Sequence, residues 1–182
     1  DDSNGELLTF KTVLTSAPYG NGEYKAWGND WLAYSESTSY ATNEWPPNGP
    51  FNTIEGDNNT KESFHSNAVE MNTSSDMNEG LIIGIEMPDR IKLSSYSIKT
   101  RPNNPERSPK KWKLYGRNGD GNAWTLIETT TTTSWTTGQT KTFTVTSGPD
   151  YYSDYYWEFI QAFNVSLQIF TIRLFGTPFI LN

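Results

Sequence analysis

The stretch 111–116, KWKLYG, alternates the apolar side chains Trp112 and Leu114 with two lysines, Lys111 and Lys113. In an extended chain, successive side chains point to opposite faces of the strand. The stretch therefore predicts a β-strand that turns Trp112 and Leu114 into a core and leaves the lysines outside. Because the same pattern returns along the chain, it decides the fold class.

The alternation recurs in four further segments. They are 94–100 (Tyr96, Ile98), 142–145 (Phe143, Val145), 156–160 (Trp157, Phe159) and 171–176 (Ile172, Leu174). Segment 80–87, GLIIGIEM, is apolar, ends before Pro88 and predicts a buried strand. The stretch 129–138, which opens with the Thr-rich run 129–133, predicts strand, loop and strand, since threonine favours strands. Short strands separated by turn residues indicate an all-β sandwich or jelly roll of about eight main strands.

Length and charge limit the classes of protein. The 182 residues fit one domain, 1–182, in which residues 1–30 form an N-terminal extension or extra strands. A formal charge of −7 opposes binding to the phosphates of nucleic acids. The chain has no cysteine, which excludes disulfides and thiolate metal sites. No apolar stretch reaches the about 18 residues of a transmembrane helix.

These features also bear on where the protein works. The chain opens at Asp1 without a methionine or a basic-then-apolar leader, so we expect any targeting segment to be absent or already removed. A cysteine-free chain rich in Tyr, Trp, Thr and Asn favours an extracellular or surface-exposed protein, secreted or carried on a phage or virus particle. The sequons at Asn58, Asn72 and Asn164 permit glycosylation only in a eukaryotic secretory pathway.

Two segments carry a resemblance to a known family. The first is 45–66, WPPNGPFNTIEGDNNTKESFHS, and the second is 108–176, which opens with SPKKWKLYGRN, continues through NAWTLIE and closes with IRLFG. Together they resemble the discoidin-like family, also called the coagulation factor 5/8 C-type domain, which overlaps with galactose-binding carbohydrate-binding modules. The resemblance spans residues 30–176 and implies a galactose-binding-like jelly-roll β-sandwich that binds its ligand through loops at one end.

The resemblance implies a sugar site in two loops. His65, the only histidine, falls on the histidine of the family's W-H-S motif, which contacts the sugar in galactose-binding members. Arg101 falls on the arginine that grips sugar hydroxyls there, and Asn103, Asn104 and Glu106 follow it as further hydrogen-bond partners. The ordinary alternatives are a packed histidine, a solvated arginine and turn residues before a proline.

A sugar site also needs an aromatic ring to cover the apolar face of the sugar. Some galactose-binding members have a tryptophan three residues after the histidine, where this chain has Ala68. The ring must therefore come from elsewhere. The candidates are Tyr40, Trp45, Phe64 and Tyr155.

The turn 54–60, IEGDNNT, resembles the family's structural Ca²⁺ site. Calcium takes oxygen ligands from carboxylates, carbonyls and hydroxyls, and Glu55, Asp57 and Thr60 stand where the family binds the ion. Glu55 replaces the family's usual Asp, and Thr171 stands where a C-terminal Glu often completes the shell. The alternative is a Gly-Asp-Asn turn that needs no ion.

We expect a non-catalytic, lectin-like adhesion module that recognises a glycan of the galactose type. Glycoside hydrolysis needs two carboxylates flanking a cleft, whereas the acidic residues here lie singly in polar loops. With one histidine, no cysteine and no G-x-S-x-G motif, neither a catalytic triad nor a histidine-rich metal site can be assembled. The chain is therefore not expected to be an enzyme.

Two alternatives belong to other classes. The first is a structural or decoration module of a virion, fibre or extracellular filament without sugar binding, in which residues 1–30 and the tail 178–182 mediate self-association or attachment to a larger assembly. The second is a membrane-lipid binder that uses the basic residues Arg107, Lys110, Lys111 and Lys113. The charge of −7 opposes the second, and we interpret these lysines as solvated residues of an edge strand.

Overall fold

A computed structural model describes residues 6–7, 23–25, 32–34, 64–65, 70–100, 104–119, 121–169 and 171–179 of the chain. The strands are β1 (Glu6–Leu7), β2 (Glu23–Lys25), β3 (Leu32–Tyr34), β4 (Phe64–His65), β5 (Leu81–Lys99), β6 (Pro109–Arg117), β7 (Thr125–Thr131), β8 (Thr140–Thr144), β9 (Tyr151–Ala162), β10 (Gln168–Ile169) and β11 (Thr171–Pro178). A short 3₁₀ helix, η2 (Pro105–Arg107), precedes β6. The predicted all-β, jelly-roll β-sandwich is confirmed.

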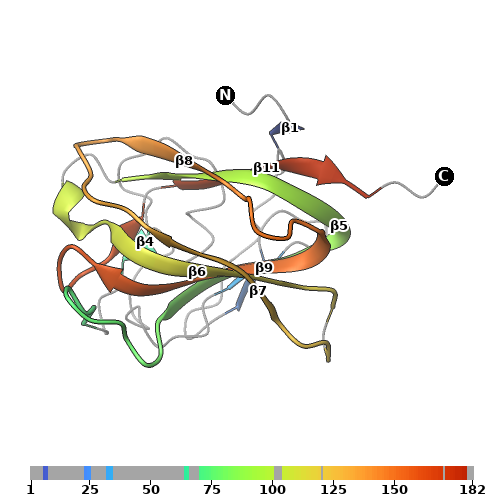
Figure 1. The fold of residues 1–182 in the computed structure, drawn as a ribbon, viewed down its shortest axis with the longest axis horizontal. Coiled ribbons are helices and arrows are strands. Elements are labelled where there is room, and N and C mark those ends of the chain that lie inside the picture. Colours follow the sequence, from blue (N-terminus) through green and yellow to red (C-terminus); the bar gives the residue numbers. More distant parts are fainter. Residues whose placement is uncertain are drawn as a thin grey trace.

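The long strand β5 joins the two layers of the sandwich. Its first part pairs with β9 on one side and β3 on the other, and its last part pairs with β11 and β8. The register shifts between Glu86 and Ile91, which is where a bulge lets a strand pass from one sheet into the next. Figure 1 shows the resulting arrangement, with β8, β11 and β1 above and β6, β9 and β7 below.

The sequence predicts two strands, 80–87 and 94–100, where the structure has the single strand β5. The prediction of a strand end at Pro88 is therefore wrong. A proline removes one ladder donor, which normally ends a strand or confines it to an edge or a bulge. Here Pro88 falls inside the register shift, where no regular ladder pairing has to be maintained.

The alternation in the sequence correctly identifies the core. Trp112 and Leu114 of β6, and Trp157 and Phe159 of β9, are completely buried. In β11, Ile172 and Leu174 are also buried. The first strand and the loop predicted from the Thr-rich stretch are the end of β7 and residues 132–139, whereas the second strand, β8, begins beyond the stretch at Thr140.

Tyr96 connects the two layers at the centre of the core. It comes from the upper part of β5 and is fully buried. Its hydroxyl accepts a hydrogen bond of 2.7 Å from the Trp112 indole N–H of the lower layer. Its ring lies 5.5 Å from Trp157 in an edge arrangement and 5.5 Å from Phe143 in a stacked one. Burial raises the pKa of Tyr96 to about 12.

Burial of tyrosine phenols makes the fold sensitive to alkali. Burial also raises the pKa of Tyr155, so both phenols hold their protons more tightly in the folded than in the unfolded state. Stability is therefore intact below about pH 10, the ordinary tyrosine pKa, and falls as the pH rises above it. We expect ultraviolet titration to show these two tyrosines ionising only together with loss of the circular dichroism signal. Reversible ionisation of all ten tyrosines in a folded protein would contradict this expectation.

The interpretation of the lysines as edge-strand residues is wrong, because β6 lies between β7 and β9. Lys111 instead forms an ion pair of 2.8 Å with Asp76. Hydrogen bonds from Lys111 and then from Gln161 hold the pKa of Asp76 below its usual range. These contacts fasten the segment before β5 to the outside of the lower layer. Among the described residues, no helix is both long and apolar enough to cross a bilayer.

Candidate functional site

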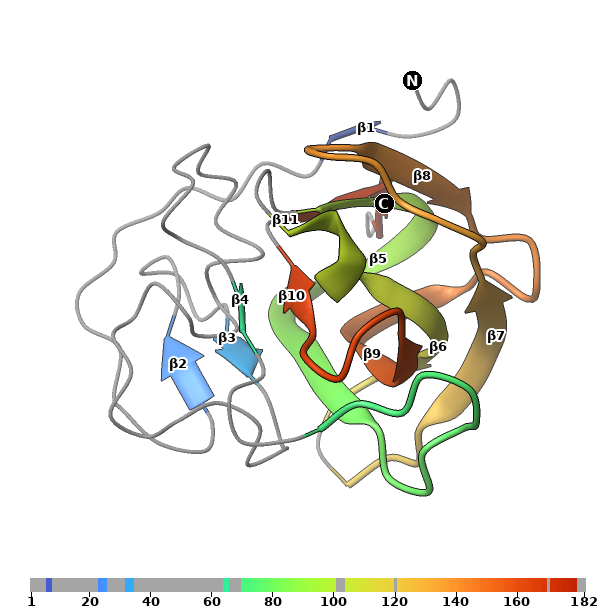
Figure 2. The ribbon, with the colours of Figure 1, turned by 90° about the vertical axis from the view of Figure 1, so that its left-hand side faces the viewer.

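The pairing of short strands places the backbone of His65 at one end of the sandwich. His65 of β4 pairs with Gln168 of β10, and Figure 2 looks onto the end where these strands lie. β11 follows β10 almost directly, and its first residue, Thr171, pairs with Lys99, the last residue of β5. Arg101 follows Lys99 by two residues. The histidine backbone and the start of the arginine loop therefore share one end, which we call the β4–β10 end.

The segment 104–108 brings the chain from β5 to the lower layer at this end. It contains η2, and the carbonyl of Ser108 accepts a hydrogen bond of 3.1 Å from the backbone N–H of Phe163. Pro109 then opens β6 opposite Ala162 of β9. Because residues 163–167 lead from β9 into β10, the two connections lie against each other.

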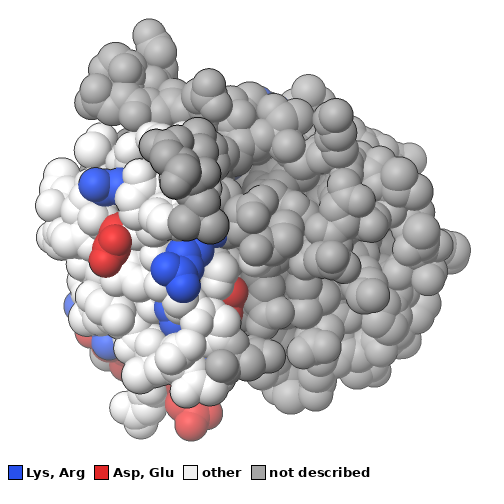
Figure 3. Space-filling model, turned by 90° about the vertical axis from the view of Figure 1, so that its right-hand side faces the viewer, with Lys and Arg blue, Asp and Glu red and all other residues white. Residues whose placement is uncertain are grey.

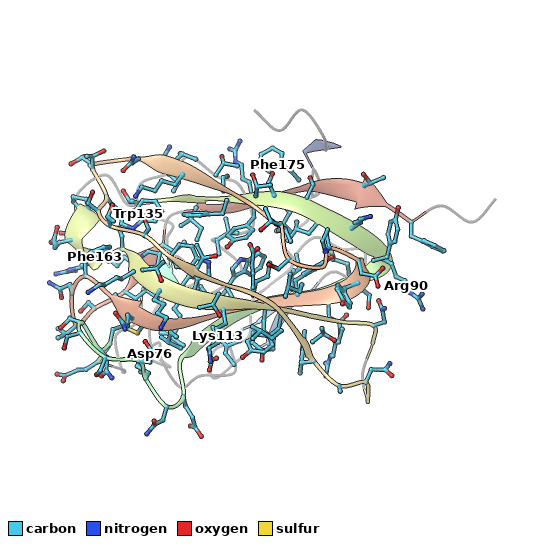
Figure 4. All side chains as sticks on the ribbon, viewed as in Figure 1. Asp76, Arg90, Lys113, Trp135, Phe163 and Phe175 are labelled. Carbon is cyan, nitrogen blue, oxygen red and sulfur yellow. The ribbon has the colours of Figure 1, made fainter. Side chains whose placement is uncertain are left out.

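The loop 132–139 fastens both layers at the same end. The backbone N–H of Thr100 donates a hydrogen bond of 2.9 Å to the carbonyl of Gln139. The indole N–H of Trp135 donates one of 2.8 Å to the carbonyl of Pro109. Figure 4 shows Trp135 and Phe163 together at this end, on the left of the view. These hydrogen bonds tie the loop to the end of β5 and to the start of β6, so they hold the backbone at this end in place.

Lys141 holds the same loop from the side of β8. Its ammonium lies 4.6 Å from the centre of the Trp135 ring and donates hydrogen bonds to the Thr132 hydroxyl, at 2.7 Å, and to the Ser134 carbonyl. Burial lowers the pKa of Lys141. Trp135 is 9% exposed and its indole N–H is bonded to the Pro109 carbonyl, so its ring supports this end and does not offer a face for a ligand.

The residues of the predicted site divide by whether the structure describes them. Asn104 is half-buried next to η2, and Glu106 within η2 is exposed. For His65 and Phe64 the structure describes the strand β4 alone. Arg101, Asn103, Trp45, Tyr40 and the predicted calcium ligands Glu55, Asp57 and Thr60 lie outside the described residues. The described residues contain no cluster of three or more acidic or histidine side chains that could hold a metal ion.

Tyr155 is not a stacking residue, which corrects one of the ring candidates. It is 1% exposed, and its hydroxyl donates to the carbonyl of Ile91 and accepts from the backbone N–H of Leu93 at 3.3 Å. The alternation of side chains along β9 already predicts this inward orientation. Tyr155 precedes Trp157 and Phe159 in the same phase of a strand and must point inward with them.

Two residues at the β4–β10 end were not predicted from the sequence. Gln168 is 1% exposed, lies opposite His65, and its side-chain oxygen receives no hydrogen bond from the described part of the chain. Phe163 is a half-buried ring with the Lys110 ammonium 5.7 Å from its centre. Phe163 could have been recognised as an aromatic at the end of a strand, whereas the position of Gln168 depends on a pairing that no local pattern reveals.

Solved structures share this architecture. A family 32 carbohydrate-binding module of Clostridium perfringens NanJ, in complex with galactose, is 19% identical, with a TM-score of 0.59 over 80% of this chain and 93% of its own. An F5/8 type C domain from Bacteroides fragilis is 11% identical, with a TM-score of 0.63 over 88% of this chain and 99% of its own. The chain has a discoidin-like fold of the galactose-binding type. No protein-family model and no curated protein matches it in sequence.

The discoidin-like fold also occurs as one part of longer enzymes. A GH29 fucosidase from Ruminococcus gnavus is 19% identical, with a TM-score of 0.55 over 81% of this chain and 25% of the fucosidase. The structural similarity, with TM-scores of 0.55 to 0.63, establishes the discoidin-like fold, and at identities of 11 to 19% function has to be argued from the site.

Proposed function

We propose that this chain is a non-catalytic carbohydrate-binding module that recognises a galactose-type glycan at the β4–β10 end. The observation that carries the proposal is the backbone register, in which β4 with His65 and the end of β5 before Arg101 meet at one end of the sandwich. The galactose complex of a module with the same fold supports the same ligand class. We further propose that residues 1–182 form one domain, and that it acts outside the cell or on a particle surface.

The proposed chemistry follows from the residue types. The Arg101 guanidinium is a planar fork of donors that suits neighbouring hydroxyls, and the His65 imidazole offers one donor or acceptor more. Asn103, Asn104 and Glu106 complete the polar partners, and a ring from Trp45, Phe64 or Phe163 covers the apolar face of the sugar. Binding would then be selective for the orientation of the hydroxyls. The set contains a single carboxylate, Glu106, and not the pair of carboxylates that glycoside hydrolysis needs.

A galactose titration followed by NMR tests the proposal. His65 is the only histidine, so its ring protons give a single set of signals that reports on this end alone. We expect these signals to shift saturably with galactose and to remain unchanged with a polyol of equal concentration. If the His65 signals stay fixed and no sugar on a glycan array is retained, the chain is instead a structural or decoration module.

We also propose a structural Ca²⁺ held by Glu55, Asp57 and Thr60, the oxygen donors of the turn 54–60. An ion that binds only the folded state raises the melting temperature by mass action. Excess EGTA is therefore expected to lower the melting temperature of the protein, and added Ca²⁺ to restore it. Asp57→Asn should melt at the chelated temperature with or without EGTA. An identical melt of the parent protein in EGTA and in Ca²⁺ would remove the ion from the proposal.

A further inference from the structure

A hollow of about 390 Å³ lies far from the β4–β10 end. It opens where β8 ends and β9 begins, beside Lys92 of β5 and Thr177 of β11. Lys92 is seven residues before Lys99, which at about 3.3 Å per residue places the hollow roughly 20 Å from the proposed galactose site. Figure 3 faces this end of the molecule, where the described surface is largely uncharged with scattered basic and acidic side chains.

A bulge in β5 lies beside the hollow, because Leu93 and Ser94 are among its lining residues. Leu93 pairs with Gly176 and Ser95 with Phe175, so the register of β5 against β11 shifts by one residue at Ser94. The Ser94 hydroxyl donates a hydrogen bond of 3.1 Å to the carbonyl of Phe175, which fixes the bulge. A Cβ on Gly176 would lie 2.4 Å from the carbonyl oxygen of Lys92, so the backbones approach closely only because this residue is glycine.

The bulge also positions the floor of the hollow. The carbonyl of Ser94 accepts a hydrogen bond of 2.8 Å from the N–H of Val145, just after β8 ends. Val145 is buried and apolar, whereas Thr144 and Thr177 are exposed and carry hydroxyls. The lining of the hollow thus combines the apolar Val145 side chain with threonine hydroxyl groups.

An aromatic ring and one cation complete the lining. The exposed Lys92 ammonium lies 5.9 Å from the centre of the half-buried Tyr151 ring, and the Phe179 ring meets Tyr151 at 5.3 Å in an edge arrangement. Lys92 is the charged residue of the lining. The neighbouring carboxylate of Asp150 accepts a hydrogen bond of 2.7 Å from the backbone N–H of Tyr151.

We propose that this hollow is a second saccharide site, and that it takes a sugar that carries a carboxylate, such as a uronic acid. The volume lies in the range of small-ligand pockets. The lysine pairs with the carboxylate, the threonine hydroxyls pair with ring hydroxyls, and Tyr151 with Val145 covers apolar carbons of the ring. The site is built entirely from described residues and is independent of His65 and Arg101.

Titration of the ¹⁵N-labelled protein with D-glucuronate and, separately, with D-glucose tests this site. We expect the amides of Lys92, Val145 and Thr177 to shift saturably with glucuronate, with weaker binding at higher salt, and to respond little to glucose. Lys92→Gln removes the ammonium and should weaken glucuronate binding roughly tenfold without changing the melting temperature. Arg101→Ala, at the other end of the sandwich, should leave glucuronate binding unchanged.

Three results would overturn the proposal. Absence of saturable shifts at these amides leaves no second site. Equal responses to glucose and glucuronate would mean that the site does not recognise the carboxylate. Unchanged glucuronate binding in Lys92→Gln removes the lysine from the site. Because the His65 signals report separately on the β4–β10 end, failure here is distinguishable from failure of galactose binding.

Discussion

Replacing Trp112 with alanine is expected to destabilise the protein by about 4 kcal/mol, a large part of the stability of a domain of this size. The indole is completely buried, lies 4.9 Å from Phe143 in an edge arrangement, and donates its N–H to the Tyr96 hydroxyl. Its removal leaves a cavity between the two layers and deprives a buried hydroxyl of its donor. Urea unfolding monitored by circular dichroism, with a fall in the melting temperature of about 10 °C, would check this result.

A matched control is Trp124→Ala. Trp124 is half-buried on the outside of the lower layer, where the Arg117 guanidinium lies 4.3 Å from its ring and Tyr156 meets it at 4.5 Å. Loss of these surface contacts is expected to remove about 1 kcal/mol. Trp112→Phe keeps a ring and loses the N–H, so its effect should lie between the two. Equal destabilisation by Trp112→Ala and Trp124→Ala would contradict the placement of Trp112 at the centre of the core.

The sequence predicts those parts of the fold that depend on local alternation. In β6 and β9 the inward phase of Trp112, Leu114, Trp157 and Phe159 follows from the period of a strand, and all four are buried. Extending that phase by two residues would also have placed Tyr155 inside. Residue type alone makes Tyr155 a ligand candidate, whereas its phase in the strand places it in the core.

Other features depend on pairing between distant segments, which local patterns do not contain. Whether Lys111 lies on an edge is decided by β7 and β9 joining β6 on its two sides. Whether Pro88 ends a strand is decided by the register shift that lets β5 continue into the second layer. The juxtaposition of Gln168 with His65 and the bulge at Ser94 have the same origin, so both candidate sites depend on non-local register.

Replacing Arg101 with alanine is expected to weaken galactose binding by one to two orders of magnitude. Hydrogen bonds from a charged group are worth about 1.5 to 3 kcal/mol, and a guanidinium can give two of them to neighbouring hydroxyls. Arg101→Lys retains the charge without the planar fork, so it should lose most of the affinity as well. The loss should appear in calorimetric titration with galactose, while the melting temperature stays at that of the parent protein.

Arg107→Ala is the matched control, because it removes the same side chain from the end of η2, six residues farther along the same connection. Arg107 has no part in the proposed site, so its variant should bind galactose like the parent protein. Equal losses in the two variants would mean that arginine acts only through the general charge of the loop. Full affinity in Arg101→Ala would leave the β4–β10 end without its principal donor and remove the basis for galactose recognition there. We therefore expect the specificity of the proposed site to depend on the position of the Arg101 guanidinium and not on the number of cations around it.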